Sequence, residues 1–143
     1  MAGHLIAGSG YITQHFRITE FACGSYIYMD PDFITFVQCL ERFRVWYNRP
    51  ININSGYRTY AKNKQVGGDI DSLHLFARAV DFNFPKEWNT YTPARKKQFV
   101  TNIKNKWFAI CKDAGAFGQI TYHKSGWIHL AMSLNREYYG EKD

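Results

Sequence analysis

The chain has 143 residues, of which 45% are hydrophobic and 17% aromatic, and its formal net charge is +6. This length and composition favour one domain over residues 1–143, with a core large enough to need no disulfide staples. No run of residues approaches the roughly 20 apolar residues of a membrane-spanning helix. The N-terminus lacks a basic segment followed by an apolar core, so we expect no signal peptide, and a product that either stays in the cytoplasm or is exported by another route. We expect the protein to be a monomer.

Cysteine usage and charge exclude further classes. Cys23, Cys39 and Cys111 are an odd set without a CxxC pair, so we expect reduced, mostly buried thiols. A basic chain is attracted to polyanions such as nucleic acid, anionic membrane or acidic wall polymers. The basic residues are spread out, however, and the densest group, ARKKQ at residues 94–98, opens an expected helix. We therefore expect no nucleic-acid partner. A strong, salt-dependent affinity for DNA would instead favour a basic nucleic-acid-binding domain.

The first half of the chain contains one clear helix. The first sixteen residues give no decisive pattern, and ITEF at residues 18–21 is typical of a short helical turn that Thr19 caps. Asp30 and Pro31 suit the N-cap and first position of a longer helix, which ends before Pro50. Its apolar residues recur at helical spacing and are expected to face the core: Ile34, Val37, Leu40, Phe43 and Tyr47.

Strands and helices alternate in the second half. The expected elements are a short strand at residues 51–54, a short helix within residues 59–68 that Gly67 and Gly68 end, a strand in ARAVDFNF at residues 77–84, a long helix from Thr92 and Pro93 to Gly115, and a hairpin of residues 117–123 and 127–133. This order predicts an α+β domain in which helices pack on one side of a small, mainly antiparallel sheet.

The segment SLHLFARAVDF, residues 72–82, is the first with chemical character. Because side chains alternate along a strand, Asp81 lies on the opposite face from Val80 and Phe82. His74 precedes the strand in a turn-like segment and can fold back toward it. A buried carboxylate needs a strong partner, since leaving it unpaired costs several kcal/mol. A metal cation and an arginine are the two candidates for that partner.

The hairpin supplies further imidazoles. With a three-residue loop, His123 pairs with Trp127 across the two strands and Thr121 pairs with His129. His123 and His129 therefore share one face and lie diagonal to each other, within side-chain reach.

Two imidazoles and a carboxylate, from His74, Asp81 and His129, make a catalytic zinc set whose fourth position is open for water. Zinc in such a site lowers the pKa of water and polarises a substrate carbonyl. Spacing alone leaves a second interpretation open, in which these are ordinary structural histidines, because no HExxH pair is present.

At this point the sequence resembles a known family. NSGYRTYAKNKQVGGDIDSLHLFARAVDF, residues 54–82, followed by GWIHLAM, residues 126–132, is similar to the zinc D-alanyl-D-alanine carboxypeptidase and L-alanyl-D-glutamate endopeptidase family. These peptidoglycan peptidases of bacteria and phages share a fold with the hedgehog signalling domain. Their motif S-x-H-x-x-G-x-A-x-D is matched by Ser72, His74, Ala79 and Asp81. The early HFRITEFAC resembles short phage members, so the similarity extends from about His15 to about Ser133.

The resemblance implies roles for individual residues. It assigns His74, Asp81 and His129 to zinc, and Arg58 to a substrate carbonyl or carboxylate, which suits the forked donors of a guanidinium. An ion pair of Arg58 with Asp69 or Asp71 is the structural alternative. Ser72 would orient the motif or contact the peptide, unless it is a plain turn serine. Trp127 and Tyr57 are expected to flank the substrate cleft, with ordinary core packing as the alternative.

Two departures from the family pattern concern the backbone and the catalytic base. The family has glycine where this chain has Ala77, which is strained if the site needs a positive φ. Many members place a glutamate shortly before the last histidine, and the aligned residue here is His123. The three glutamates considered as substitutes lie too far away in sequence or outside the motif: Glu20, Glu41 and Glu87. We therefore expect His123 to act as the base, with an exposed hairpin histidine as the alternative.

The function implied by the resemblance is zinc-dependent cleavage of peptidoglycan stem peptides, at the D-Ala-D-Ala end or at the L-Ala-D-Glu bond. A short domain without a signal peptide suits a phage or prophage lysin that acts at the cell wall, and the positive charge suits an anionic wall. The rival is a zinc-containing binding module of the same fold, which holds a wall peptide or a protein partner without cleaving it. The missing glutamate keeps this rival open.

Overall fold

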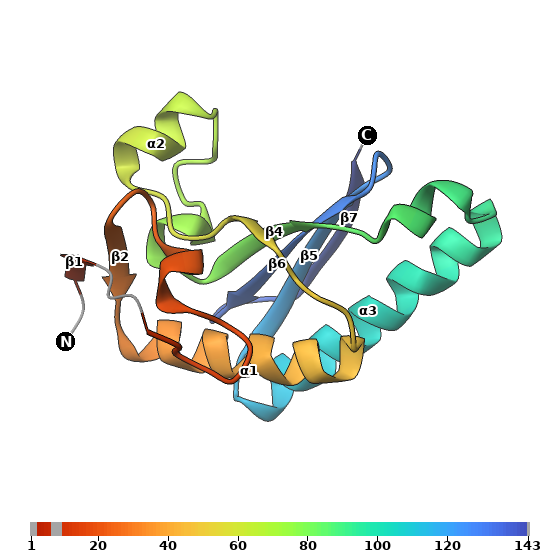
Figure 1. Cartoon of the computed structure of the whole chain (residues 1–143), viewed down its shortest axis with the longest axis horizontal. Coiled ribbons are helices and arrows are strands. Elements are labelled where there is room, and N and C mark those ends of the chain that lie inside the picture. Colours follow the sequence, from red (N-terminus) through yellow and green to blue (C-terminus); the bar gives the residue numbers. More distant parts are fainter. Residues whose placement is uncertain (1–2, 7–9, 143) are drawn as a thin grey trace.

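A computed structural model describes residues 3–6 and 10–142 (Figure 1). Within these residues, two-stranded β1–β2 stands beside a five-stranded sheet in the order β3–β4–β6–β5–β7, and only β5 and β7 run parallel. The elements are β1 (Gly3–Ile6), η1 (Ile18–Phe21), β2 (Tyr26–Met29), α1 (Pro31–Tyr47), β3 (Ile53–Ser55), α2 (Tyr60–Gln65), η2 (Leu73–Phe76), β4 (Ala79–Asn83), η3 (Lys86–Thr90), α3 (Pro93–Asp113), β5 (Phe117–His123), β6 (Trp127–Ser133) and β7 (Tyr138–Lys142). This arrangement confirms the expected α+β class.

One face of the five-stranded sheet forms the core. Its fully buried residues alternate along the central strands: Val80, Phe82, Ile120, Ile128 and Leu130. The long helices α1 and α3 pack against this face, as expected (Figure 1), and the Trp107 Nε1–H of α3 donates to the Ala131 carbonyl at 2.9 Å. The opposite face of the sheet is therefore left for the polar residues of β4 and β6.

The helix ends follow the capping residues that the sequence predicts. Asp30 Oδ1 accepts from the Phe33 amide at 2.8 Å at the start of α1, which ends where Asn48 adopts a left-handed conformation. Thr92 caps α3 through the Arg95 amide, and Gly115, at φ +78°, follows its last turn. Because these caps satisfy backbone groups at the helix ends, they fix where each helix meets the sheet.

Two expectations about the first half are wrong. Ile34 is 38% exposed, because the buried stripe of α1 begins at Phe33 and continues through Phe36, so Ile34 falls outside it. Thr19 does not cap η1; the N-cap is Arg17, whose backbone N–H donates to Glu20 Oε2 at 2.7 Å.

The strand boundaries differ from the expectation at three places. β3 is displaced toward the following glycine and carries an irregularity in its pairing with β4. β1 and β2 arise partly from the first sixteen residues, of which positions 1, 2 and 7–9 lie outside the described residues. β7, with the sequence YYGEK, has no clear apolar alternation and is mostly exposed, so only its pairing with β5 identifies it as a strand.

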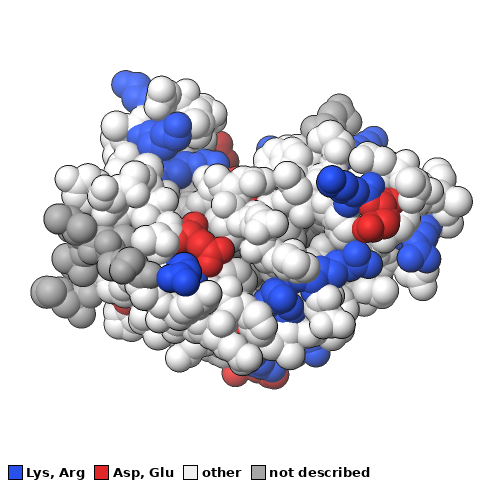
Figure 2. Space-filling model, in the orientation of Figure 1, with Lys and Arg blue, Asp and Glu red and all other residues white. Residues whose placement is uncertain are grey.

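Thiols and charge follow the sequence analysis. Cys39 and Cys111 are buried, Cys23 is half-buried, and all three are free. Lys and Arg are scattered over the face seen in Figure 2, where acidic side chains lie among them, and do not gather in one patch. In the described part of the chain, no helix is both long and apolar enough to cross a membrane.

His15 and Glu41 join the N-terminal segment to α1. Glu41 Oε1 accepts from the His15 backbone N–H at 2.8 Å, and Oε2 lies 2.5 Å from His15 Nδ1. Burial alone would raise the pKa of Glu41, but the hydrogen bonds from His15 outweigh it and hold the pKa below the usual range. The ionised carboxylate therefore stabilises this docking.

We predict that Glu41→Gln lowers the free energy of unfolding at pH 7 by about 1–2 kcal/mol, because hydrogen bonds to a charged group are lost. A carboxylate with a depressed folded-state pKa stabilises above its unfolded pKa of about 4.3 and loses that effect as pH falls through the folded-state value. The difference between variant and wild type should therefore shrink below about pH 4 in urea titrations. Glu137→Gln, at an exposed position, is the matched control; an equal loss in both variants would contradict the role of this contact.

Candidate metal centre

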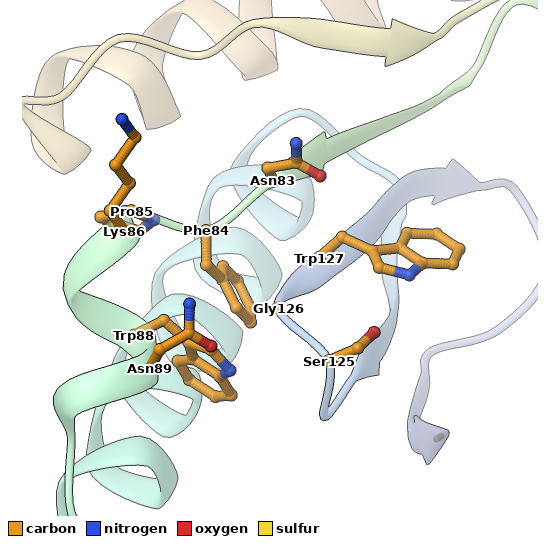
Figure 3. A pocket seen from close by; sticks show the side chains of 9 residues that line it. All are labelled: Asn83, Phe84, Pro85, Lys86, Trp88, Asn89, Ser125, Gly126 and Trp127. Carbon is orange, nitrogen blue, oxygen red and sulfur yellow. The ribbon is translucent and has the colours of Figure 1, made fainter.

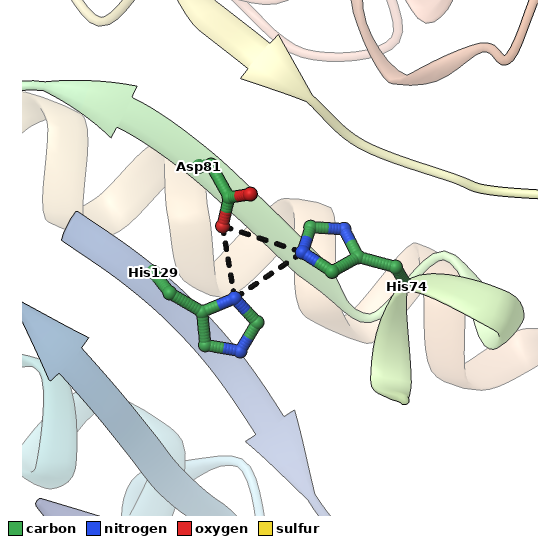
Figure 4. Close-up of side chains that lie close together, drawn as sticks. All are labelled: His74, Asp81 and His129. Atoms are coloured by element: carbon green, nitrogen blue, oxygen red, sulfur yellow. Dashed lines mark hydrogen bonds and ion pairs between the residues drawn. The ribbon is translucent and has the colours of Figure 1, made fainter. Parts of the chain in front are cut away.

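Asp81 and His129 face each other across two neighbouring strands. The register of β4 and β6 pairs them directly, and His129 Nδ1 lies 2.9 Å from Asp81 Oδ1. His74, on η2, completes the group, with Nε2 at 3.2 Å from His129 Nδ1 and 3.3 Å from Asp81 Oδ1 (Figure 4). The structure thus brings together the three residues that the sequence analysis proposed as metal ligands, and their ligand atoms lie within 4.8 Å of one another.

The loop that carries His74 is held by its own backbone and by Ser72. Ser72 is the N-cap of η2 and its Oγ accepts from the His74 backbone N–H at 3.2 Å. The His74 carbonyl accepts from the Arg58 N–H at 2.9 Å and the Ala77 N–H at 3.2 Å. Ser72 therefore caps the turn that carries His74, as a turn serine does; its roles in orienting the motif and in contacting the peptide stay proposals.

Ala77 ends this turn in a left-handed conformation, with φ +57° and ψ +32°. The family has glycine here, and the expected strain at a positive φ is present. An alanine in this region costs roughly 1–2 kcal/mol. The buried surroundings of Ala77, which is 2% exposed, and the hydrogen bonds of the turn hold this conformation.

A backbone carbonyl selects the tautomer of His74. His74 Nδ1 lies 2.6 Å from the Gly56 carbonyl oxygen, which can only accept, so the proton is on Nδ1. The lone pair of Nε2 is therefore directed at Asp81 and His129. Gly56 is required at this point, because an added Cβ would lie 2.8 Å from the backbone of Phe21. The sequence analysis missed Gly56, although it lies in the quoted SGYR segment.

Asp81 is a buried carboxylate that stays ionised. Burial acts to raise its pKa, but the adjacent imidazoles of His129 and His74 outweigh burial and hold the pKa well below the usual range. Its other oxygen, Oδ2, lies 3.4 Å from Arg58 Nη2. Oδ1 thus faces the two imidazoles, while Oδ2 faces the Arg58 guanidinium.

Each of the three guanidinium nitrogens of Arg58 has a partner near Asp81. Nε donates to Ser55 Oγ at 3.3 Å, Nη1 to Asn63 Oδ1 at 3.3 Å and Nη2 to Asp81. The ion pair is therefore with Asp81, and the alternative pairing with Asp69 or Asp71 is wrong. The contacts support a positioning role for Arg58; its contact with substrate stays a proposal.

Asn63, which the sequence analysis missed, braces the same network. Its side chain is buried, accepts from Arg58 and donates from Nδ2 to the Asp69 carbonyl at 2.7 Å. Gly68 leaves room for it, because an added Cβ would lie 2.1 Å from Asn63 Oδ1. A buried asparagine within a short exposed helix, four residues before a Gly-Gly pair, gives no distinctive sequence signal.

His123 lies on the same face of the sheet as His129, diagonal to it across strands β5 and β6. The β5–β6 register pairs it with Trp127 and pairs Thr121 with His129, as expected from a three-residue loop. The imidazole stacks on the Trp127 indole, with ring centroids 3.5 Å apart and planes at 11°. Both side chains are half-buried. His123 is therefore next to the candidate metal centre, in a fixed ring orientation.

The remaining sequence candidates lie elsewhere. Tyr57 is 7% exposed and its ring stacks on Tyr28 at 6.2 Å, so the structure favours core packing over the expected cleft role. Burial raises the pKa of Tyr57. The three glutamates contact other groups: Glu20 holds the Arg17 amide, Glu41 holds His15, and Glu87 lies 3.5 Å from Arg49.

Comparison with known proteins identifies a family. The family model described as Peptidase M15 matches residues 14–131, which is 118 of the 143 residues. No curated protein matches the chain. The matched region includes every residue of the candidate metal centre and ends two residues after His129.

The donor set fits the zinc on which M15 peptidases depend. Zinc bonds of about 2.0–2.1 Å at tetrahedral angles place ligand atoms about 3.3 Å apart. The three separations here, 2.9, 3.2 and 3.3 Å, are close to that value. An ionised carboxylate and an imidazole nitrogen with a directed lone pair are the ligands that such an ion requires.

We predict one zinc per chain in protein purified without added metal. His74→Ala or His129→Ala should lose the metal, because three protein ligands leave no spare. Elemental analysis after gel filtration measures the stoichiometry, and circular dichroism verifies folding. His4→Ala, which changes a histidine outside the set, should keep full stoichiometry. Metal-free wild-type protein that nevertheless cleaves its substrate would contradict this assignment.

We also predict that Arg58→Ala weakens zinc affinity by about 10–100-fold while leaving the three ligands in place, the usual effect of losing an outer-shell partner. Arg58→Lys should recover only part of the loss, since an ammonium cannot reproduce the fork to three partners. Competition with a chromogenic chelator gives the affinities, and exposed Arg136→Ala is the control. Unchanged zinc affinity in Arg58→Ala would assign Arg58 to the substrate instead.

Proposed function

This chain belongs to the peptidase M15 family, which indicates a metallopeptidase, and we propose that it is a zinc peptidase that hydrolyses the stem peptides of peptidoglycan. The observation that carries the proposal is the convergence of His74, Asp81 and His129 through ligand atoms 2.9–3.3 Å apart. The substrate bond is the D-Ala-D-Ala or the L-Ala-D-Glu bond.

The residues around the centre have separate tasks in this proposal. Zinc, held by His74, Asp81 and His129, would supply a Lewis acid that polarises the scissile carbonyl. Arg58 orients Asp81 through its contact with Oδ2. The Gly56 carbonyl fixes the protonation of His74 and thereby the direction of its lone pair. The site is therefore organised before any substrate arrives, which is how a protein stabilises developing charge without reorganisation.

His123 is the proposed acid–base residue. It lies on the site face, diagonal to His129, and its stacking on Trp127 holds the ring plane. A ring nitrogen of His123 would accept a proton from the attacking water and deliver it to the nitrogen of the leaving amine. An imidazole suits this exchange near neutral pH. Trp127, beside it, would form an apolar wall of the cleft.

The setting follows from the substrate. We propose that the protein acts at the bacterial cell wall as a phage or prophage lysin. Its net charge of +6 would favour association with an anionic wall polymer.

The alternative is a zinc-containing binding module of the same fold. It is favoured by a specific observation: position 123 is histidine, and the three glutamates considered as substitutes contact other partners. Without a working base the site would hold a wall peptide or a protein partner and release it intact.

A turnover assay on purified peptidoglycan, with and without a chelator, distinguishes the two functions. We predict that the zinc-loaded protein releases new amino termini and that the chelator abolishes the release. His123→Ala should keep zinc and folding but lose turnover by about a hundredfold or more, the contribution of a positioned acid–base group. His123→Glu should retain much of the activity.

The control is Lys124→Ala, the exposed residue next to His123. Unchanged turnover in His123→Ala would place the base elsewhere. Zinc-loaded wild-type protein that binds wall fragments and cleaves none of them would establish the binding module.

A further inference from the structure

A pocket adjoins the candidate metal centre along the sheet. Asn83 pairs with Trp127 across β4 and β6, just as Asp81 pairs with His129. Because alternate residues share a face, these two pairs are consecutive on the same face, roughly 7 Å apart at about 3.4 Å per residue. The pocket opens at the Asn83–Trp127 pair and extends between η3 and the β5–β6 turn (Figure 3).

The pocket is the size of a substrate fragment. Its volume is about 260 Å³, slightly below the roughly 300–1,000 Å³ of sites for drug-sized ligands. Phe84 and Trp88 form its apolar base; both are nearly fully buried, and the Trp88 N–H is satisfied by the Lys124 carbonyl at 3.0 Å. The base is therefore rigid and preformed.

The rim carries polar groups with unused hydrogen-bonding capacity. In the part of the chain that the structure describes, the side chains of Asn89 and Ser125 and the Trp127 Nε1–H make no hydrogen bond to protein. Asn83 uses Oδ1 to accept from Asn54 at 3.1 Å, which leaves its amide N–H groups to donate. The Lys86 ammonium extends away from the other lining side chains in Figure 3, and the Lys96 ammonium lies over the Trp88 ring, 5.1 Å from the ring centroid.

An aromatic base with neutral polar groups at the rim suits a sugar ring. An aromatic side chain offers an apolar surface to the C–H face of a pyranose, and neutral amides and hydroxyls pair with its hydroxyl and acetamido groups. A stem-peptide carboxylate would instead require a directed cation. The stacking of His123 on Trp127 holds the indole in place, which lowers the entropy cost of binding a rigid ring.

We infer that this pocket, lined by Asn83, Asn89, Ser125 and Trp127, binds the N-acetylated sugar that carries the stem peptide. The inference rests on the proposed function and narrows it. A sugar that sits about 7 Å from the metal ligands is separated from the scissile carbonyl by roughly two residue lengths at about 3.4 Å each. That spacing places the cleaved bond at the sugar-proximal end of the stem, which favours the L-Ala-D-Glu bond over the D-Ala-D-Ala end.

Paired substrates test the inference. The zinc-loaded protein should cleave N-acetylmuramoyl-L-Ala-D-Glu-L-Lys with a kcat/KM at least tenfold above that of acetyl-L-Ala-D-Glu-L-Lys. Asn89→Ala and Ser125→Ala should each reduce this preference about three- to tenfold, as expected for one lost hydrogen bond. Asn102→Ala, an exposed asparagine on α3, is the matched control and should keep the preference.

A binding measurement separates failure of the subsite from failure of the peptidase. N-acetylmuramoyl-L-alanine should shift the indole N–H resonance of Trp127, assigned with Trp127→Phe, whereas acetyl-L-alanine should not. The shift without any cleavage would support the subsite and reject the proposed function. Equal kcat/KM for both substrates, with no shift, would reject the subsite and leave the peptidase intact. Loss of D-Ala-D-Ala cleavage in Asn89→Ala would show that the pocket holds peptide, and would also reject the sugar.

Discussion

The cross-strand pair of Asp81 and His129 is the contact on which the site depends. It exists only in one register of β4 and β6, and the alternation of the core fixes that register. A slip by one residue would turn Asp81 toward α1 and α3 and move Val80 to the open face. An unpaired carboxylate in that core would cost several kcal/mol, in addition to the lost burial of the apolar side chains. The same alternation of apolar and polar residues along β4 and β6 therefore sets both the packing of the core and the placement of these two ligands.

The third ligand depends on local backbone geometry and not on sheet register. His74 is held by the Ser72 cap, by the Gly56 carbonyl on its ring and by the left-handed turn at Ala77. The turn stores about 1–2 kcal/mol of backbone strain that glycine would avoid. The chain tolerates this strain because the turn is tied at several points to the SGYR segment, whose Arg58 amide donates to the His74 carbonyl. Strain of this kind is common where a functional side chain must be presented in a fixed orientation.

The sequence predicts the parts of the molecule that depend on local patterns. Capping residues locate α1 and α3, and a three-residue loop gives the β5–β6 register, which in turn places His123 beside Trp127. Contacts between distant segments have no such signal. The parallel pairing of β7 and the enclosure of Tyr57 depend on where the chain returns in space. The resemblance of the SGYR segment to the family identifies Arg58 as important, but only the fold shows that its three donors point at Ser55, Asn63 and Asp81.

His123 and Trp127 connect the two halves of the open face. In one row across the sheet, Trp127 lies between Asn83 of the pocket and His123, and this row is next to that of Asp81 and His129. Because a stacked imidazole can present its nitrogens only in the plane of the ring, the indole limits the directions in which His123 can exchange a proton. A ligand that moves the indole would therefore move the proposed base as well. If both proposals hold, occupancy of the pocket and proton transfer at the centre would be coupled through this pair of rings, and a substrate that fills the pocket would also fix the base in place.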